Sequence, residues 1–593
     1  MISAGKSVQA VARRRMHPAQ CQTLANTFST GHHSPTTKPF TKKKSRSSLS
    51  PCPIIIQQQS HVPRFFFCSS STLTTSCASL SENDTTHAPP PAYLAELQSL
   101  LPHVDISVNP YERDRHGRGE SHHPPRPPDV VVCPLSTHDV QQIVRLCVAR
   151  HIPLIPFGAG TSVEGHVQAL QGGISLDMVH FQDMELPDTN RMNHDASLET
   201  SSSSSSFPDP LATVGAGVTR LQLNEALRHT GYYFSVDPGA NATLGGMVAT
   251  GASGTSAVRF GGMRDNIVAL ECVLPNADAT VVQCGTRASK NSAGYDLVSL
   301  LCGSEGTLAV ITKITVRLRP VPQHVLCAIC QFETVFAAAQ AVAMIQMMDL
   351  TFLSRCELLD TASVEAWNAY NNNKQESSQL DTQATTTTAA KNLLAKPTLF
   401  FEFQGPSETA LQEQVEMTES ICVGDDGFGG SSFTFASDAQ ERQELWSARH
   451  SLMYAATAMR PGATRSIITD ACVPISRFAE LISETSKDVQ ELGVVGPCFG
   501  HAGDGNLHCI LPVRPDEDED YLRRVFQVND NLIQRTLAAG GTCTGEHGVG
   551  YGKIPYLERQ YGPGAVHMMQ LIKKSIDPHN IMNPGKVVPL SFN

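Results

Sequence analysis

Acidic residues are missing from the start of this 593-residue chain, where Glu82 is the first one. Residues 1–81 carry ten Lys and Arg and are rich in Ser and Thr. The remainder therefore has 35 Lys+Arg against 56 Asp+Glu, a formal charge of -21, whereas the whole chain has -11. A basic leader without acidic residues is typical of an organelle-targeting peptide. We predict that 1–81 is a disordered mitochondrial targeting leader; the alternative is a basic tail that stays attached.

Other features that the chain lacks exclude further classes of protein. No run of 18 apolar residues is uninterrupted, so the sequence predicts no transmembrane segment. The acidic balance argues against a nucleic-acid binder, which would show a basic field. The 17 Cys are odd in number and scattered, which does not indicate a disulfide framework. With 41% hydrophobic residues, the length allows two to four globular domains of roughly 150 residues each.

Apolar patterns predict an α+β protein with two different domains. The first shows strands at 130–133 and 152–157 around a helix that the run 136–139 can cap and that continues to about Arg150. After Pro322 the sequence predicts strands at 324–332 and 397–404, a strand pair within 494–513, and helices at 334–348, 475–492 and 521–539. Low-complexity stretches at 188–210 and 371–392 have too little apolar content to fold and are expected to be surface insertions.

Three clusters of Gly, Ser and Thr lie at 156–166, 236–262 and 292–308. Glycines let the backbone approach a phosphate and direct N–H groups toward it. One such loop alone, with Asp177 at a suitable distance for a ribose contact, would also fit a dinucleotide-binding Rossmann unit. Three clusters within about 150 residues favour a large polyphosphate cofactor threaded through several loops rather than ordinary tight turns.

The runs PGANATLGGM at 238–247 and GSEGTL at 303–308, followed by VRLRP at 316–320, resemble the vanillyl-alcohol-oxidase-type flavoproteins. The branch they resemble contains D-lactate dehydrogenase (cytochrome) and the glycolate oxidase D-subunit, and the likeness covers roughly residues 90–590. It implies an entry segment (82–124), a two-subdomain PCMH-type FAD-binding domain (125–322), an α+β, ferredoxin-like substrate or cap domain (323–575) and a C-terminal segment that returns to the FAD domain (576–593).

The resemblance also implies which residues hold the cofactor. Some relatives tether FAD through a His directly after the last Gly of the first loop, where this chain has Thr161, so we expect non-covalent FAD. The expected cofactor-binding residues are Pro156, Gly158, Gly160, Thr161, Ser162, Pro238, Gly239, Thr243, Gly245, Gly246, Gly251, Ser253, Gly254, Gly303, Glu305, Gly306 and Asn583.

Three His and a Glu stand on Gly-lined turns in the second domain. His501 and His508 flank an Asp504-Gly505 bend that can bring the two imidazoles together, and Glu546 completes a His2Glu set suited to a divalent metal with open positions. His547 remains free to act as a base. The alternative is that these are buried, hydrogen-bonded histidines. The resemblance implies the same roles, with zinc or manganese as the metal.

A carboxylate substrate also needs a cation, and Arg449 in the pattern WxxRH is the best candidate because a planar guanidinium can bind a carboxylate through two hydrogen bonds. A helix-surface position for Arg449 is the alternative, and Arg460, Arg465 and Lys586 are weaker candidates. Asn506 is expected to hold the substrate or the flavin edge.

These features predict an FAD-dependent D-2-hydroxy-acid dehydrogenase. The resemblance favours oxidation of D-lactate to pyruvate: a metal binds the hydroxyl and carboxylate, His547 takes the hydroxyl proton, the Cα hydride passes to flavin N5, and cytochrome c accepts the electrons. The alternatives are a D-2-hydroxyglutarate dehydrogenase, which needs a further cation, and a glycolate-oxidising subunit. More distant ones are a metallohydrolase without flavin and a non-catalytic flavin-binding protein.

Overall fold

The structure, a computed structural model, describes residues 91–187, 209–379, 392–436 and 438–589. The predicted leader at 1–81 lies outside these residues, as do 188–208 and 380–391 of the two predicted insertions. Within the described ranges, no helix is both long and apolar enough to cross a bilayer.

The first domain begins with a four-stranded sheet in the order β1-β2-β4-β3. Strands β2 and β3 both run parallel to β4, and helix α5 connects β2 to β3. Ser136 caps α5 by accepting a hydrogen bond from the N–H of Asp139, as predicted. The elements are α3 (Leu94–Leu100), β1 (Asp105–Ser107), α4 (Pro110–His116), β2 (Val130–Cys133), α5 (Thr137–Arg150), β3 (Leu154–Phe157) and β4 (Ile174–Asp177).

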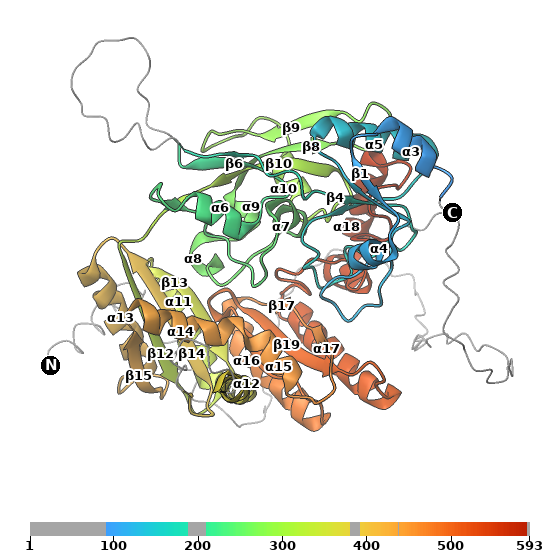
Figure 1. The fold of residues 1–593 in the computed structure, drawn as a ribbon. Helices are drawn as coiled ribbons and strands as arrows, with labels where there is room; N and C mark the ends of the chain where they lie inside the picture. The colour runs from blue at the N-terminus through green and yellow to red at the C-terminus, as the bar shows by residue number, and fades with distance from the viewer. Residues whose placement is uncertain (1–90, 188–208, 380–391, 437, 590–593) are drawn as a thin grey trace, which may run out of the picture. The chain divides into compact units, whose positions relative to one another are not determined.

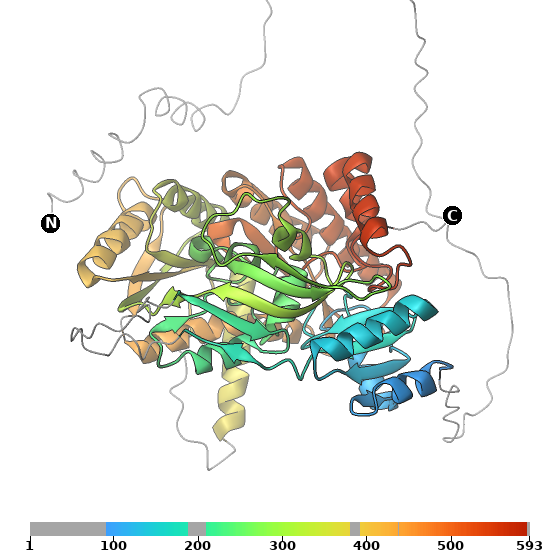
Figure 2. The ribbon, with the colours of Figure 1, turned by 90° about the horizontal axis from the view of Figure 1, so that it is seen from above.

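A five-stranded antiparallel sheet in the order β5-β6-β10-β8-β9 completes this domain and appears in green at the centre of Figure 2. Its core is continuous with that of the first sheet. The elements are β5 (Met184–Glu185), β6 (Leu211–Gly215), α6 (Arg220–Ala226), α7 (Leu244–Thr250), α8 (Ala257–Phe260), α9 (Met263–Asn266), β8 (Ile267–Val273), β9 (Val281–Gly285), α10 (Leu297–Leu301) and β10 (Val310–Arg317). A small ribbon pairs β7 (Tyr232–Tyr233) with β11 (Arg319–Pro320).

The second domain is built on an antiparallel sheet in the order β15-β12-β14-β13-β18-β19-β16, with β17 also paired to β19. The strands predicted near 324–332, 397–404 and 494–513 are confirmed. The strands are β12 (His324–Gln331), β13 (Leu353–Leu359), β14 (Thr398–Gly405), β15 (Ser431–Ala436), β16 (Arg465–Ile468), β17 (Ala471–Cys472), β18 (Cys498–Gly500) and β19 (Asn506–Val513).

Helices cover the two faces of this sheet differently. One face forms the main core with α11 (Val335–Met347), α13 (Glu408–Val423), α16 (Ile475–Glu491) and α17 (Glu519–Ala538). The opposite face carries a smaller core with α12 (Thr361–Gln379), α14 (Ala439–His450) and α15 (Leu452–Ala458). The three predicted helices of this domain are confirmed as α11, α16 and α17.

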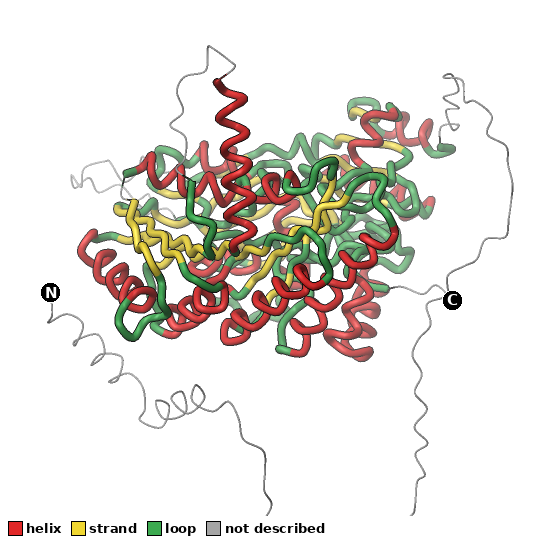
Figure 3. The backbone as a smooth tube through the Cα atoms, turned by 90° about the horizontal axis from the view of Figure 1, so that it is seen from below, coloured by secondary structure: helices red, strands yellow, loops and turns green. Residues whose placement is uncertain are grey.

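Helix α12 corrects one sequence prediction. A loop was expected from residue 371, but α12 continues to Gln379. Its far end extends away from the sheet, as the yellow helix in Figure 2 and the upright red helix in Figure 3 show. A polar end of this kind needs no apolar partner, because the helix satisfies its own backbone hydrogen bonds in water.

The chain returns to the first domain at its C-terminal end (Figure 1). Helix α18 (Ile554–Ile576) is kinked at Gly562 and is followed by Ile581 and Met582, which are buried in the first core. Asn583 donates to the backbone oxygens of His166 and Glu305. The C-terminal segment therefore packs in the same hydrophobic core as the first helix of the described chain.

Candidate active site

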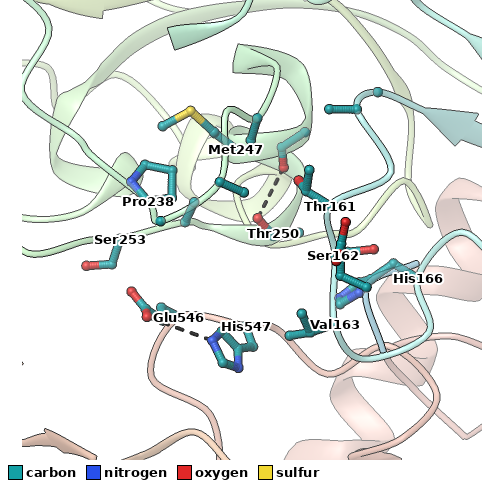
Figure 4. Close-up of a pocket in the computed structure, with 18 of the residues that line it drawn as sticks. Thr161, Ser162, Val163, His166, Pro238, Met247, Thr250, Ser253, Glu546 and His547 are labelled. Atoms are coloured by element: carbon teal, nitrogen blue, oxygen red, sulfur yellow. Dashed lines mark hydrogen bonds and ion pairs between the residues drawn. The ribbon is translucent and has the colours of Figure 1, made fainter. Parts of the chain in front are cut away.

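A cavity of about 540 Å³ lies where the glycine-rich loops of the first domain meet the second domain. Figure 4 shows Pro238, Met247 and Thr250 on one side and Glu546 and His547 on the other. Gly158 packs against Thr243 so closely that an added Cβ would come within 2.3 Å of the hydroxyl oxygen. Glycine is therefore required where the first two loops meet.

Most of the predicted cofactor residues line this cavity. These are Pro156, Gly158, Gly160, Thr161, Ser162, Pro238, Gly239, Thr243, Gly246, Ser253, Glu305, Gly306 and Asn583. Four others lie outside its lining. Gly245 packs against Ala216, Gly254 packs against Asp237, and Gly251 and Gly303 line a neighbouring cavity.

One polar atom of the cavity lacks the hydrogen-bond partner that a bound phosphate-containing group could supply. The Ser162 hydroxyl is buried without a hydrogen-bond partner among the described residues, and it lies on the first glycine-rich loop. Such an atom normally has a partner, because leaving it unpaired costs about 1–3 kcal/mol. The cavity volume lies in the usual range of cofactor sites, roughly 300–1,000 Å³.

The predicted metal ligands converge on one carboxylate oxygen. Oε1 of Glu546 lies 3.2 Å from Nε2 of His501 and 3.2 Å from Nε2 of His508. The two imidazole rings stand edge to face, with centroids 5.5 Å apart. The bend between β18 and β19 brings them together, since Phe499 pairs with His508 across the strands. All three residues line the cavity.

Hydrogen bonds made by the Nδ1 atoms of His501 and His508 place a proton on Nδ1 of each ring. Nδ1 of His508 donates to the carbonyl oxygen of Thr469 (3.0 Å), which can only accept, and Nδ1 of His501 donates to the Glu357 carboxylate (2.7 Å). Where an Nε2 atom carries no proton, its lone pair points toward the Glu546 carboxylate. Two such lone pairs and a carboxylate oxygen can hold one cation between them, and a divalent metal with open coordination positions fits this geometry.

The pKa values of Glu546 and His501 are strongly shifted by their neighbours in this cluster. Burial raises the pKa of Glu546, but the two neighbouring imidazoles outweigh it and hold that pKa well below its usual range. Burial lowers the pKa of His501, but Glu357 and Glu546 outweigh it and raise that pKa well above normal. The site therefore retains an anionic carboxylate and attracts positive charge, which without a metal is a second proton on Nε2 of His501.

His547 lies beside this cluster but faces differently. Its ring stacks on His508 with centroids 5.1 Å apart, and its Nε2 lies 3.8 Å from Oε1 of Glu546. Its Nδ1 lies 4.0 Å from the buried Asp470 carboxylate and has no hydrogen-bond partner among the described residues. Burial lowers the pKa of His547 to about 4, so the ring is neutral near pH 7 and can accept a proton.

Asp470, which the sequence gave no reason to select, holds the loop before His547. Its carboxylate accepts from the N–H groups of Glu546 and His547 (2.9 Å each), from the Thr544 hydroxyl (2.7 Å) and from Asn506 Nδ2 (3.1 Å). Asn506, which is predicted to hold the substrate or the flavin edge, lies outside the cavity lining, and its Nδ2 donates to Asp470.

Glu305 connects the same loop to the glycine-rich loops of the first domain. Its carboxylate accepts from the N–H groups of Val549 (2.6 Å) and Gly550 (2.8 Å). The adjacent Gly548 has φ +80°, and a Cβ there would lie 2.7 Å from Oε1 of Glu305. The third glycine-rich cluster thus fixes the position of the His547 loop.

Arg449 lines the cavity from helix α14, and its side chain is 11% exposed, so it is not on an open helix surface. Its Nε donates to Glu357 (2.6 Å), while its two terminal nitrogens make no hydrogen bond to the described residues. Its guanidinium lies over the Phe499 ring, 4.8 Å from the centroid. The weaker candidates, Arg460, Arg465 and Lys586, lie outside the cavity lining. Arg460 pairs with Glu517, and Lys586 donates to Gln168 and Asn583.

Two family models match the chain. Residues 128–285 match the model described as an FAD binding domain, and 321–587 match the C-terminal domain of FAD linked oxidases. The probable mitochondrial D-lactate dehydrogenase of Danio rerio is 42% identical over 84% of this chain and 92% of its own length. The mitochondrial D-lactate dehydrogenase [cytochrome] of Arabidopsis thaliana is 39% identical over 84% and 80%. Glycolate oxidase subunit GlcD of Bacillus subtilis is 31% identical over 78% and 89%.

Solved structures show the same fold at low sequence identity. p-Cresol methylhydroxylase aligns with a TM-score of 0.62 at 16% identity, covering 83% of this chain and 95% of its own. Alkyldihydroxyacetonephosphate synthase aligns with a TM-score of 0.60 at 18% identity, covering 84% and 86%. The predicted fold class, with its PCMH-type FAD-binding domain, is confirmed.

Proposed function

Because this chain belongs to the family of FAD-linked oxidases that contains the mitochondrial D-lactate dehydrogenases, we propose that it is an FAD-dependent dehydrogenase that oxidises D-lactate to pyruvate. One observation carries the proposal. A candidate metal-binding triad, a neutral imidazole and an arginine line a single cavity opposite the glycine-rich loops. The relatives' mitochondrial names and the basic leader together support a mitochondrial location.

The residues that line the cavity have different proposed roles in the reaction. When bound, the flavin supplies the hydride acceptor, and a divalent metal on His501, His508 and Glu546 supplies the positive charge that makes the substrate hydroxyl more acidic. Arg449 binds the substrate carboxylate with its two terminal nitrogens. His547 accepts the hydroxyl proton at Nε2, and the Asp470 carboxylate near Nδ1 stabilises the imidazolium that forms.

The wall of the cavity argues against a dicarboxylate substrate. Among the described lining residues, Arg449 is the single Lys or Arg, whereas D-2-hydroxyglutarate would need a second cation for its distal carboxylate. Beside Arg449 the wall is formed by Met453, Ile468, Phe499 and Ile510, which suit an apolar side chain. A flavin-free metallohydrolase would leave the glycine-rich loops without a role.

Anaerobic mixing with substrates tests the function. We expect D-lactate to bleach the flavin absorbance of the purified protein, L-lactate to leave it unchanged, and D-2-hydroxyglutarate to reduce it with a kcat/KM at least about tenfold lower, the cost of one unpaired carboxylate. A preference for D-2-hydroxyglutarate would contradict the substrate, and a protein that binds no flavin would contradict the function.

Cytochrome c is the proposed electron acceptor. The proposal is supported by the word cytochrome in the name of the Arabidopsis thaliana relative and by the charge of -21 after residue 81. An acidic protein attracts a basic partner at a rate that falls with ionic strength. Raising salt from 20 to 200 mM should therefore slow cytochrome c reduction about tenfold while leaving reduction of a neutral dye unchanged. Equal slowing of both reactions would exclude electrostatic docking.

A further inference from the structure

Glu357 lies near the centre of strand β13 and is completely buried, although it belongs to no sequence motif. Its two carboxylate oxygens contact two different residues of the proposed site. Oε1 accepts from Nδ1 of His501 (2.7 Å), and Oε2 accepts from Nε of Arg449 (2.6 Å). These partners lie 144 and 92 residues away along the chain. One side chain therefore connects the metal cluster to the substrate cation.

A buried carboxylate costs several kcal/mol unless its oxygens are paired. Here each oxygen has a different task. The bond to Nδ1 of His501 holds a proton on that nitrogen and turns Nε2 toward Glu546, so that Nε2 is the nitrogen available to a metal. The bond to Nε of Arg449 holds the guanidinium plane, so that its terminal nitrogens remain available to the cavity. Both partners need an acceptor, and an ionised carboxylate is the side chain that offers two.

We propose that Glu357 is a shared positioning residue, which orients His501 for the metal and Arg449 for the substrate carboxylate at the same time. The proposal rests on the function proposed above for the two partners. Metal binding and carboxylate binding then depend on one side chain that touches neither ligand. Ordinary core roles for Glu357 predict a loss of stability; this role predicts two binding defects in a folded protein.

Glu357→Gln is the informative substitution because glutamine keeps the size but offers one acceptor and one donor. Its amide group must face the N–H of His501 or of Arg449, and donor then meets donor. In the flavin-loaded protein we expect the Zn²⁺ dissociation constant, measured by competition with a fluorescent chelator, to rise about 10–100-fold. We expect the KM for D-lactate, measured with saturating metal, to rise about tenfold.

Two further variants separate positioning from folding. Glu357→Asp retains two acceptors and should recover a large part of both losses. Asp488→Asn is the matched control, since Asp488 is also a buried carboxylate paired with an arginine (Arg535, 2.9 Å) in the same domain, but outside the cavity. It should change neither constant. Should Glu357→Gln be unfolded, the Asp variant carries the test, with smaller shifts of both constants expected and unshifted constants contradicting the proposal.

The outcomes distinguish this proposal from the function on which it rests. If Glu357→Gln is folded, holds FAD and changes one constant alone, or neither, the shared role is wrong. Zn²⁺ affinity is measured without turnover, so it reports on the His501 arm even if D-lactate proves not to be the substrate. Failure of the wild-type flavin to be reduced by any D-2-hydroxy acid contradicts the proposed function and leaves the metal measurement valid.

Discussion

Glu546→Gln should lower the kcat of D-lactate oxidation about 1,000-fold while the protein keeps its FAD. Glutamine preserves the shape of the side chain but removes the negative charge at the point where the Nε2 atoms of His501 and His508 converge, each 3.2 Å from Oε1. A metal ion contributes several kcal/mol to the stabilisation of developing charge, and about 4 kcal/mol corresponds to about 1,000-fold in rate. Steady-state kinetics, with metal and flavin content measured on the same samples, give the answer.

Chelation tests the same site without mutation. Dialysis of the wild-type protein against a strong chelator should abolish turnover, and added Zn²⁺ or Mn²⁺ should restore it. For Glu546→Gln the matched control is Glu517→Gln, because Glu517 also pairs with a basic side chain in the second domain but lies outside the cavity lining. It should retain wild-type activity. Full activity in a preparation shown to be free of metal would contradict the proposed metal site.

Local patterns in the sequence were sufficient to predict much of the fold. Ser136 lies in the predicted capping run and Thr334 is where a helix was predicted to begin, and both are N-caps in the structure. A cap acts within three residues, so it is visible in the sequence. The bend at Gly505 was informative for the same reason, since it brings His501 and His508 into one cluster over a separation of seven residues.

The residues that the sequence did not reveal act over long separations. Glu357 and Asp470 have no motif of their own, because their partners come from other strands and loops. One signal was present in the strand 353–359, where Arg355 and Glu357 alternate with apolar residues. Two charges on one face of an otherwise buried strand must be paired, so they indicate a polar network. The identity of the partners could not be predicted without the fold.

The prediction of cofactor contacts in the glycine-rich loops was limited by a different ambiguity. Glycines that approach a ligand and glycines that approach another part of the backbone have the same sequence signature. Gly245 and Gly254, which are expected to contact the cofactor, lie outside the cavity lining and pack against Ala216 and Asp237. The position of a glycine in such a run is therefore weaker evidence of a contact than the run itself.

His547→Gln should lower kcat for D-lactate about 10²–10⁴-fold, the usual contribution of a general base, with little change in bound FAD or metal. The ring is the neutral imidazole beside the proposed metal ligands, with Nε2 3.8 Å from Oε1 of Glu546 and Nδ1 near the Asp470 carboxylate. Glutamine fills similar space but cannot take the hydroxyl proton. Substrate should still bind, because Arg449 and the metal ligands are intact, so KM should change much less than kcat.

A kinetic isotope experiment distinguishes loss of the base from loss of geometry. If His547 takes the hydroxyl proton, the variant becomes limited by the chemical step, and flavin reduction by D-lactate deuterated at Cα should show a larger isotope effect than in the wild type. His567→Gln, an exposed histidine on α18, is the control and should behave as the wild type. A His547→Gln enzyme with undiminished kcat would show that another group takes the proton. In that case Asp470→Asn should be measured in the same assay, because the Asp470 carboxylate lies near Nδ1 of His547 and accepts from its backbone N–H. A loss of kcat in Asp470→Asn alone would show that the reaction requires the position of the loop and not the His547 imidazole.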